Sequence, residues 1–314
     1  MPKANILFMG TPEFALPSLE KLIKNDYPVA AVVTQPDRPK GRGKQLLAPP
    51  VKIAAERYNI PVLQPARIKD PSFLETLERI SPDLIVVAAF GQILPKEILN
   101  FPRLGCINVH PSLLPKYRGA APINWSLIRG ESRTGVTIMY MDVGLDTGDI
   151  LLHEETPIDP DETFGHLHDR LASLGASLLL KAIQLLETDT APRNPQENAQ
   201  SSYAPMLQKE DGLIQWDKEV STIVNLIRGL SPVPGAYTHL DGKTFKIFVA
   251  TGTEQPVPGN PGQLGNLSAE GLQVTAGNGY VYLKEIQIEN RKRMNISDFL
   301  RGYKLTPGTF FGLR

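Results

Sequence analysis

The sequence has little that would mark a secreted, membrane-spanning or metal-cluster protein. Its 314 residues include one cysteine, Cys106, so neither an intrachain disulfide nor a thiolate metal cluster is expected. No apolar run approaches the roughly 20 residues that a membrane-spanning helix needs. A strand is predicted at residues 4–9, which leaves no room ahead of it for a signal peptide. These absences favour a cytoplasmic protein without a membrane partner.

The chain also lacks an excess of positive charge. Lysine and arginine total 33, aspartate and glutamate total 33, and the net charge is zero. A nucleic-acid-binding protein often carries a global basic excess, so any contact with RNA must come from a local basic patch. One long polar loop, predicted at residues 35–50, contains such a patch against the single acid Asp37: Arg38, Lys40, Arg42 and Lys44. Most charge runs are solvated surface, but a loop of this length inside a compact domain is usually functional or disordered.

A dinucleotide fingerprint is absent as well. The first predicted strand, residues 5–9, leads through Gly10 and Thr11 into a helix, an arrangement that resembles the opening of a nucleotide-binding fold. The Gly-x-Gly-x-x-Gly spacing is missing, so no glycine pair admits a pyrophosphate. We therefore exclude NAD as a cofactor.

Strand and helix patterns alternate through the first part of the chain. Strands are predicted at residues 5–9, 29–34, 61–64, 83–88, 106–110, 135–141 and 149–154. This alternation is typical of an α/β protein with a Rossmann-like, mostly parallel sheet, in which we expect the last strand to return antiparallel. Later β-prone runs separated by Gly, Pro and Asn predict a small barrel. The predicted organisation is a domain at 1–189, a linker at 190–207 and a β-barrel domain at 208–314.

The stretch from Gly105 to Gly119 carries the strongest sign of chemistry. Side chains alternate along a strand, so Asn108 and His110 point to one side, about 6 to 7 Å apart. Pro111 then ends the strand, and ligands bind at the carboxyl ends of strands in open α/β sheets. A lone histidine at a strand end is more often only hydrogen-bonded, but an acidic, Gly-rich loop at residues 142–149 adds a carboxylate source.

Two possible nucleophiles lie near His110. Ser112 lacks the Gly-x-Ser-x-Gly elbow of a serine hydrolase, and prolines flank its loop. Cys106 shares the face of Asn108, yet a single cysteine in a strand is more often a small buried hydrophobe. Metal catalysis is not expected either, because the aspartates of the acidic loop have no paired histidine spacing.

Two segments of the chain resemble the folate-dependent formyltransferase family: Asn108-Val-His110-Pro-Ser-Leu-Leu-Pro115 and Asp142-Val-Gly-Leu-Asp146-Thr-Gly148. The segments 10–14 and 34–43 and the second domain are similar to the members that act on tRNA, and the match runs nearly end to end. The resemblance implies a Rossmann-like domain followed by an oligonucleotide-binding-like (OB-like) barrel. It also implies transfer of a formyl group from 10-formyltetrahydrofolate to the amine of methionyl-initiator-tRNA, by a monomer.

The resemblance also implies roles for individual residues. Catalysis would rest on Asn108, His110 and Asp146, without a metal. The folate would be bound by residues of three loops: Phe90, Gly91, Gln92, Ile93 and Leu94; Ser112, Leu113, Leu114 and Pro115; and Asp142. On pattern alone Phe90, Ile93 and Leu94 are equally suited to a hydrophobic core. The tRNA would contact Arg38, Lys40, Arg42 and Lys44, and Arg42 would enter the acceptor stem.

Other functions remain open at the level of sequence. A formyltransferase that acts on a small amine would share the Asn-His-Asp set without needing the basic patch or the barrel. A 10-formyltetrahydrofolate hydrolase would use the same groups on water. A non-catalytic RNA-binding barrel protein would show no turnover. Product analysis with and without charged tRNA separates these functions.

Overall fold

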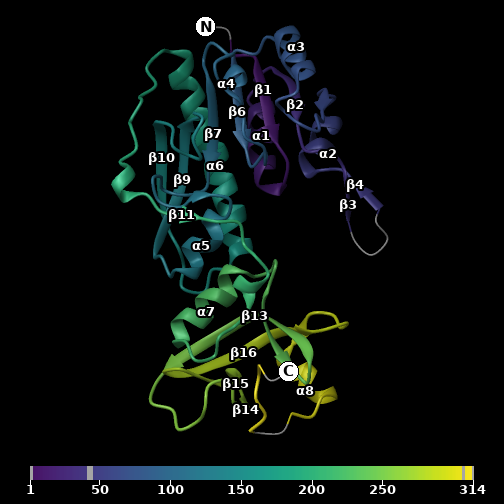
Figure 1. Cartoon of the computed structure of the whole chain (residues 1–314), viewed down its shortest axis with the longest axis vertical. Coiled ribbons are helices and arrows are strands. Elements are labelled where there is room, and N and C mark those ends of the chain that lie inside the picture. The colour runs from purple at the N-terminus through teal and green to yellow at the C-terminus, as the bar shows by residue number, and fades with distance from the viewer. Residues whose placement is uncertain (1–2, 41–44, 306–307, 313–314) are drawn as a thin grey trace. The chain divides into compact units, whose positions relative to one another are not determined.

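The structure is a computed structural model that describes residues 3–40, 45–305 and 308–312 (Figure 1). Its internal contacts divide the chain into two compact units. The first contains Met1–Gly119, Arg133–Pro157 and His168–Ala204, and the second contains Ala120–Ser132, Ile158–Leu167 and Pro205–Arg314. These units differ from the predicted domains, because two internal segments join the second unit and most of the predicted linker joins the first.

A seven-stranded sheet in the order β10-β9-β7-β6-β1-β2-β5 forms the centre of the first unit. Its strands are β1 (Ile6–Gly10), β2 (Val29–Val33), β5 (Val62–Leu63), β6 (Leu84–Ala88), β7 (Cys106–His110), β9 (Arg133–Tyr140) and β10 (Ile150–Pro157). The ladders among β5, β2, β1, β6 and β7 are parallel. Every residue of β1 and β6 is buried, as expected for parallel strands covered on both faces. The predicted fold class, a mostly parallel sheet domain followed by a β domain, is confirmed.

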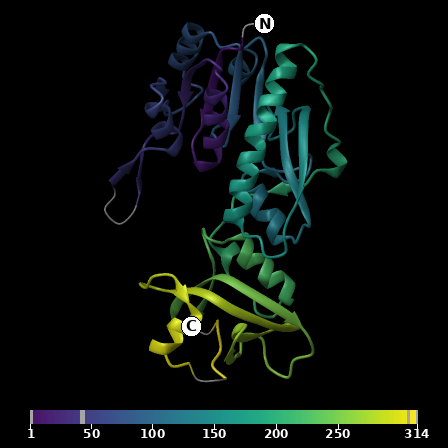
Figure 2. The same ribbon diagram turned by 180° about the vertical axis from the view of Figure 1, so that it is seen from behind.

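Helices cover both faces of this sheet. The unit contains η1 (Glu13–Ala15), α1 (Leu16–Lys24), α2 (Pro50–Arg57), α3 (Pro71–Ile80), α4 (Lys96–Leu99) and most of α6 (Phe164–Glu187). On one face, Cys106 packs in a core cluster with Leu77 of α3 and Ile98 of α4. On the other, a Cβ at Gly175 of α6 would lie 2.7 Å from Val109, so the bare backbone permits close packing. The long α6 runs beside the sheet in Figure 2.

The antiparallel reversal in the sheet occurs one strand earlier than expected. β9 is antiparallel to β7, and β10 is antiparallel to β9. The connection from β7 to β9 contains α5 (Pro122–Ile128), which belongs to the second unit and packs on its α7 (Val220–Gly229). Since parallel neighbours need a crossover connection and α5 does not serve as one, β9 returns in the opposite direction.

The predicted polar loop at 35–50 contains a hairpin. β3 (Arg38–Lys40) pairs with β4 (Gln45–Leu47), with Arg38 opposite Leu47. The hairpin projects away from the sheet beside α2 (Figure 1). Its strands have three residues each, too short for an alternating pattern to reveal them. Arg42 and Lys44 lie outside the described residues, as does the Lys40 side chain.

An antiparallel sheet organises the second unit. Its strands follow the order β12-β13-β16-β15-β14, and β17 pairs with β16. The elements are β12 (Ala236–Leu240), β13 (Lys243–Glu254), β14 (Leu264–Ser268), β15 (Gly271–Ala276), β16 (Gly279–Ile288), β17 (Met294–Asn295), α8 (Ile296–Gly302) and η3 (Glu210–Gly212). Trp216 stacks on Phe311 and Phe245 meets Phe299 edge-on within its core. No helix of the described residues is long and apolar enough to cross a membrane.

Candidate active site

His110 ends β7 as a buried side chain with both ring nitrogens near oxygen atoms. Its Nε2 lies 3.0 Å from the backbone oxygen of Tyr117. A carbonyl oxygen only accepts, so Nε2 carries a hydrogen and donates it. Nδ1 lies 3.7 Å from Oδ2 of Asp146. The imidazole is therefore fixed by Tyr117, while its second nitrogen faces a carboxylate.

The carboxylate of Asp146 is held on a second side by the backbone. Oδ2 accepts a hydrogen bond of 2.8 Å from the amide of Gly119. Asp146 itself has φ of 53°, a left-handed conformation that side chains other than glycine adopt at a cost. Gly119 pairs with Ala204 in the two-stranded ladder of β8 (Arg118–Gly119) and β11 (Tyr203–Ala204), where an added Cβ would lie 2.7 Å from the Ala204 oxygen. The structure thus brings two of the three predicted catalytic side chains together.

Asn108 completes the predicted set two residues before His110 on β7. The alternation of a strand directs its side chain to the same side as His110. The side chain is half-buried, and its amide has no hydrogen-bond partner within the described part of the chain. A half-buried amide without a protein partner is suited to bind a substrate atom.

Cys106 lies on the same face of β7 but is buried among apolar residues. Its Sγ lies 3.6 Å from the backbone oxygens of Ile98 and Leu99 in α4. Burial raises the pKa of the thiol to about 12. The thiol is therefore protonated at neutral pH, and the structure supports the expectation that it is no nucleophile.

The proline-rich loop after β7 uses its polar groups to hold its own shape. Ser112 is buried, and its hydroxyl donates to the Lys116 oxygen over 2.7 Å, so this proton is engaged away from the imidazole. The hydroxyl of Thr137 donates to the Ser112 oxygen and accepts from the Leu114 amide. Leu114 is buried, while Leu113 and Pro115 are half-buried. These contacts describe a rigid wall, with no support for a serine nucleophile.

The loop of residues 90–94, predicted to bind the pterin ring, divides into core and surface. Phe90 and Leu94 are buried in the core cluster, whereas Ile93 is 77% exposed. Gly91 has φ of 86°, in the region that favours glycine. Gln92 accepts from the Ile68 amide through Oε1, and its buried Nε2 has no partner among the described residues. That unpaired donor and the exposed loop backbone are the groups left to meet a ligand.

The backbone oxygen of Phe90 links this loop to the strand ends beside it. It accepts from the Thr11 hydroxyl at 3.0 Å and from Nε2 of Gln35 at 3.3 Å. Oε1 of Gln35 accepts from Arg38 in the hairpin. Sequence reasoning named neither Thr11 nor Gln35 as a site residue, because their bonds go to backbone atoms that leave no trace in a motif.

An ion pair between Lys52 and Asp37 holds the base of the hairpin. Lys52 of α2 donates to the Asp37 carboxylate at 2.9 Å, and Nε2 of Gln64 donates to it at 2.7 Å. The hydrogen bond from Gln64, followed by that from Lys52, lowers the pKa of Asp37. Of the four predicted tRNA contacts, only the Arg38 side chain lies within the described residues, and it is exposed.

Asp142 is exposed and shapes the acidic loop from within. Oδ1 accepts from the Gly144 amide at 3.0 Å and from the Thr147 hydroxyl at 2.7 Å. These bonds order the turn between Met141 and Gly148 that carries Asp146. No group of three or more metal-ligating side chains was found among the described residues.

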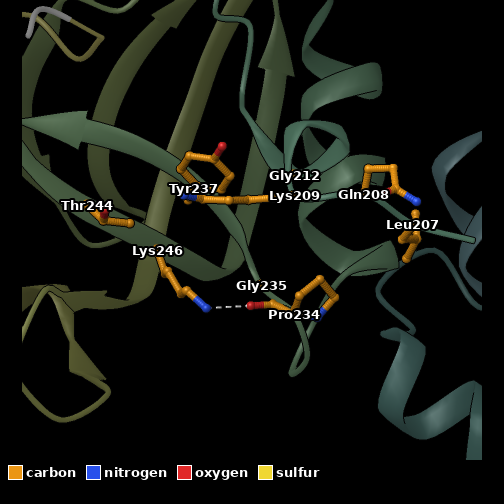
Figure 3. Close-up of a pocket in the computed structure, with 9 residues that line it drawn as sticks. All are labelled: Leu207, Gln208, Lys209, Gly212, Pro234, Gly235, Tyr237, Thr244 and Lys246. Carbon is orange, nitrogen blue, oxygen red and sulfur yellow. Dashed lines mark hydrogen bonds between the residues drawn. The ribbon is translucent and has the colours of Figure 1, made fainter.

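A separate pocket lies in the second unit and contains none of the predicted site residues. The pocket has a volume of about 220 Å³. Figure 3 shows the residues that line it: Leu207, Gln208, Lys209, Gly212, Pro234, Gly235, Tyr237, Thr244 and Lys246. Its charged groups are the ammonium groups of Lys209 and Lys246, and the latter donates to the Pro234 oxygen at 2.6 Å. Without a carboxylate or histidine, this pocket suits binding of an anionic or aromatic group rather than acid–base chemistry.

Comparison with known proteins places these observations in a family. The family model of formyl transferase matches residues 3–183, and that of the formyl transferase C-terminal domain matches residues 206–304. A methionyl-tRNA formyltransferase of Syntrophus aciditrophicus is 76% identical over 312 residues, which cover 99% of this chain and 100% of that protein. Another, of Geotalea uraniireducens, is 54% identical over 313 residues, which cover 99% of each chain.

The fold is also found among solved structures. HypX from Aquifex aeolicus in complex with tetrahydrofolic acid is similar with a TM-score of 0.67 and 18% identity, over 100% of this chain and 51% of that one. The chain thus spans about half the length of HypX, and the likeness shows a shared fold. The family itself is shown by the two family models and the two full-length relatives: the chain belongs to the formyl transferase family, among the methionyl-tRNA formyltransferases.

Proposed function

We propose that the protein transfers the formyl group of 10-formyltetrahydrofolate to the α-amine of methionyl-initiator-tRNA, giving formylmethionyl-tRNA for translation initiation. The observation that carries this proposal is the His110–Asp146 pair beside the unpartnered Asn108 amide at the end of β7. Full-length identity to methionyl-tRNA formyltransferases supports the choice of amine. We also propose that the enzyme is cytoplasmic, as the sequence predicts.

Formyl transfer needs hydrogen-bond donors and a route for a proton. The amine attacks the formyl carbon and forms a tetrahedral intermediate whose oxygen carries negative charge. We assign the Asn108 amide and a proton on Nδ1 of His110 as donors to that oxygen, because Nε2 of His110 is bound to Tyr117. As the bond from carbon to N10 breaks, Asp146 directs a proton from the amine toward N10 through water.

The folate is proposed to lie against the loops of residues 90–94 and 112–115. The unpaired Nε2 of Gln92 and the left-handed backbone at Gly91 support a role for the first loop in reading a polar ring edge. Asp142 contributes through the shape of the acidic loop. These assignments rest on the family resemblance together with the polar groups left open in the structure.

The tRNA is proposed to contact the basic hairpin and the second unit. Arg38 is exposed on the hairpin, and Lys209 and Lys246 give local positive charge to the pocket of the second unit. These patches compensate for the absence of a global basic excess. We also propose that the enzyme is a monomer, which size-exclusion chromatography with light scattering tests directly.

One assay tests the proposal as a whole. The purified full chain is incubated with 10-formyltetrahydrofolate and methionyl-initiator-tRNA, and formylmethionyl-tRNA is measured. We expect turnover that depends on both substrates. A formyltransferase for a small amine would not formylate the charged tRNA, and a hydrolase would release formate at the same rate without it.

A further inference from the structure

Gln196 lies within the segment that composition predicts to be a linker, yet its side chain contacts the loop that carries Asp146. Nε2 donates to the backbone oxygen of Asp146 at 2.9 Å and to that of Gly148 at 2.7 Å. Oε1 accepts from Nε and Nη2 of Arg118 at 3.0 and 2.7 Å. Both amide hydrogens and both oxygen lone pairs are thus engaged, so a single half-buried side chain joins the loop of Asp146 and Gly148 to Arg118.

The partners of Gln196 fix the orientation of its amide. Two carbonyl oxygens require a donor, and a guanidinium requires an acceptor. Reversing the amide would place N–H groups against Arg118 and an oxygen against Asp146 and Gly148. A glutamate at this position could accept from Arg118 but could not donate to the two carbonyls.

The loop that Gln196 holds needs external support. Asp146 has a left-handed backbone conformation, which is unfavourable for a residue other than glycine and persists only where surrounding contacts hold it in place. Gly148 is also constrained, because an added Cβ would lie 1.9 Å from the Tyr140 oxygen. Gln196 binds the backbone oxygens of both residues, so it acts on the part of the loop that sets where the Asp146 carboxylate points.

Arg118 connects the same amide to the second support of that carboxylate. Arg118 and Gly119 form β8, and the Gly119 amide donates to Oδ2 of Asp146. Arg118 further donates to Oδ1 of Asn198 at 2.9 Å. Gln196 thus binds the backbone of Asp146 directly and, through Arg118, the strand whose amide binds the Asp146 side chain.

We propose that Gln196 is a positioning residue for formyl transfer, which holds the Asp146 carboxylate against His110. The inference rests on the proposed role of Asp146. It assigns to residues 190–204 a part in the active site, in place of the role of a passive spacer.

The segment around Gln196 has other attachments, so its side chain is not needed to keep the chain in place. Asn194 and Ile150 exchange backbone hydrogen bonds of 2.8 and 3.1 Å. Ser202 accepts from the Arg118 amide through its backbone oxygen and from the Tyr117 amide through Oγ. A change at Gln196 is therefore expected to disturb the Asp146 loop while leaving the segment docked.

The test uses the full chain with Gln196→Met and Gln196→Glu, measured as steady-state formylation of methionyl-initiator-tRNA. Methionine has a side chain of similar length but makes none of the four hydrogen bonds. Glutamate can still accept from Arg118 and loses only the two bonds that Gln196 donates to the loop. We expect kcat to fall on the order of 10²-fold in both variants, the scale of a misplaced catalytic group, with KM for both substrates within about twofold. Gln200→Met and Gln200→Glu are the matched controls, because Gln200 is exposed and, among the described residues, its Nε2 donates only to the side chain of Glu197, three residues earlier.

A double-mutant cycle separates positioning from a general structural role. In an Asp146→Asn background, Gln196→Met should lower kcat by less than about threefold, because the group that it positions is already impaired. An equal loss in both backgrounds, or Gln196 variants as active as the Gln200 controls, would overturn the inference. Failure of the wild-type chain to formylate the tRNA would instead overturn the proposed function. Thermal unfolding of each variant identifies any loss that is due to unfolding.

Discussion

At the residue scale, the surroundings of His110 decide which of its protons can reach a substrate. The backbone oxygen of Tyr117 accepts the hydrogen bond from Nε2. Only Nδ1 is then left to face a substrate, and it lies 3.7 Å from the Asp146 carboxylate. That separation is longer than a hydrogen bond, so it leaves Nδ1 open to a substrate oxygen once the ring is protonated there, as the proposed transfer requires. In the proposed mechanism, Asp146 is therefore the partner that orients the protonated ring and balances its charge.

Removing any member of the proposed catalytic set should lower turnover strongly. Asn108→Ala, His110→Ala and Asp146→Ala are each expected to lower kcat by on the order of 10² or more, the typical effect of losing an oxyanion donor or an acid–base group. His153→Ala, an exposed histidine of β10, is the control and should retain wild-type activity. Asp146→Ala with near-normal kcat would remove Asp146 from the mechanism.

The Cys106 thiol should be inert in the folded enzyme. Its raised pKa and burial predict no alkylation by iodoacetamide at pH 8 in native protein and complete alkylation in denaturant. Intact-mass measurement during turnover should show no formyl adduct, and Cys106→Ala should keep most of the activity. A formylated Cys106 would restore the covalent mechanism that burial argues against.

The same thiol predicts how stability depends on alkaline pH. Its pKa rises from 9.0 in the unfolded reference to about 12 in the fold, so the folded state holds the proton more tightly. The associated stability is complete below pH 9 and is lost as the pH rises toward 12. Cys106→Ala should therefore flatten the fall of unfolding free energy across that range in urea titrations. Part of the fall with pH should remain in this variant, because burial also raises the pKa of Tyr27 to about 12.

At the scale of elements, the hairpin β3–β4 is expected to serve the tRNA and leave the folate site intact. Arg42→Ala should weaken tRNA binding and reduce the log–log salt slope by roughly one unit or less, the effect of one lost phosphate contact. Folate affinity should not change. Arg57→Ala, at an exposed arginine of α2, is the control. Titrations of tRNA at several salt concentrations decide the matter, and an unchanged slope would contradict a phosphate contact.

How far the sequence predicts each element depends on where its interactions go. β1, β6 and β7 were predictable because their buried runs and the prolines after His110 are local signals. The direction of β9 was not, because it depends on α5 packing with α7, about a hundred residues away in the chain. Gln196 was missed for a related reason: it binds backbone carbonyls, whose positions follow from the fold rather than from a residue type.

At the scale of the whole molecule, the second unit is assembled from three stretches of chain. Within it, the buried Asn124 of α5 donates to the Gly229 oxygen of α7 at 2.8 Å. Ile128 packs against the core of the antiparallel sheet. Arg228 donates to the oxygen of Asp159, and the Gly165 amide donates to the oxygen of Ser231. A single cut in the chain therefore cannot release one unit whole.

A chain that ends at Ala204 should be far less stable than the full protein, although it retains every residue of the first unit, including the paired strands β8 and β11. It would remove the Gly229 oxygen to which the Asn124 amide donates, a hydrogen bond that contributes about 0.5–1.5 kcal/mol. Exposing the half-buried Ile128 further adds less than the roughly 1.5–3 kcal/mol that exposing a fully buried isoleucine costs. Against a typical stability of about 5–15 kcal/mol, we expect a clearly lower Tm and a matching loss of folate affinity. Adding Ile128→Lys to the short chain should recover part of both, because a lysine side chain at this position tolerates water. Equal melting of the short and full chains, with unchanged folate binding, would show that residues 120–132 fold without α7 and that 1–189 is a domain in its own right.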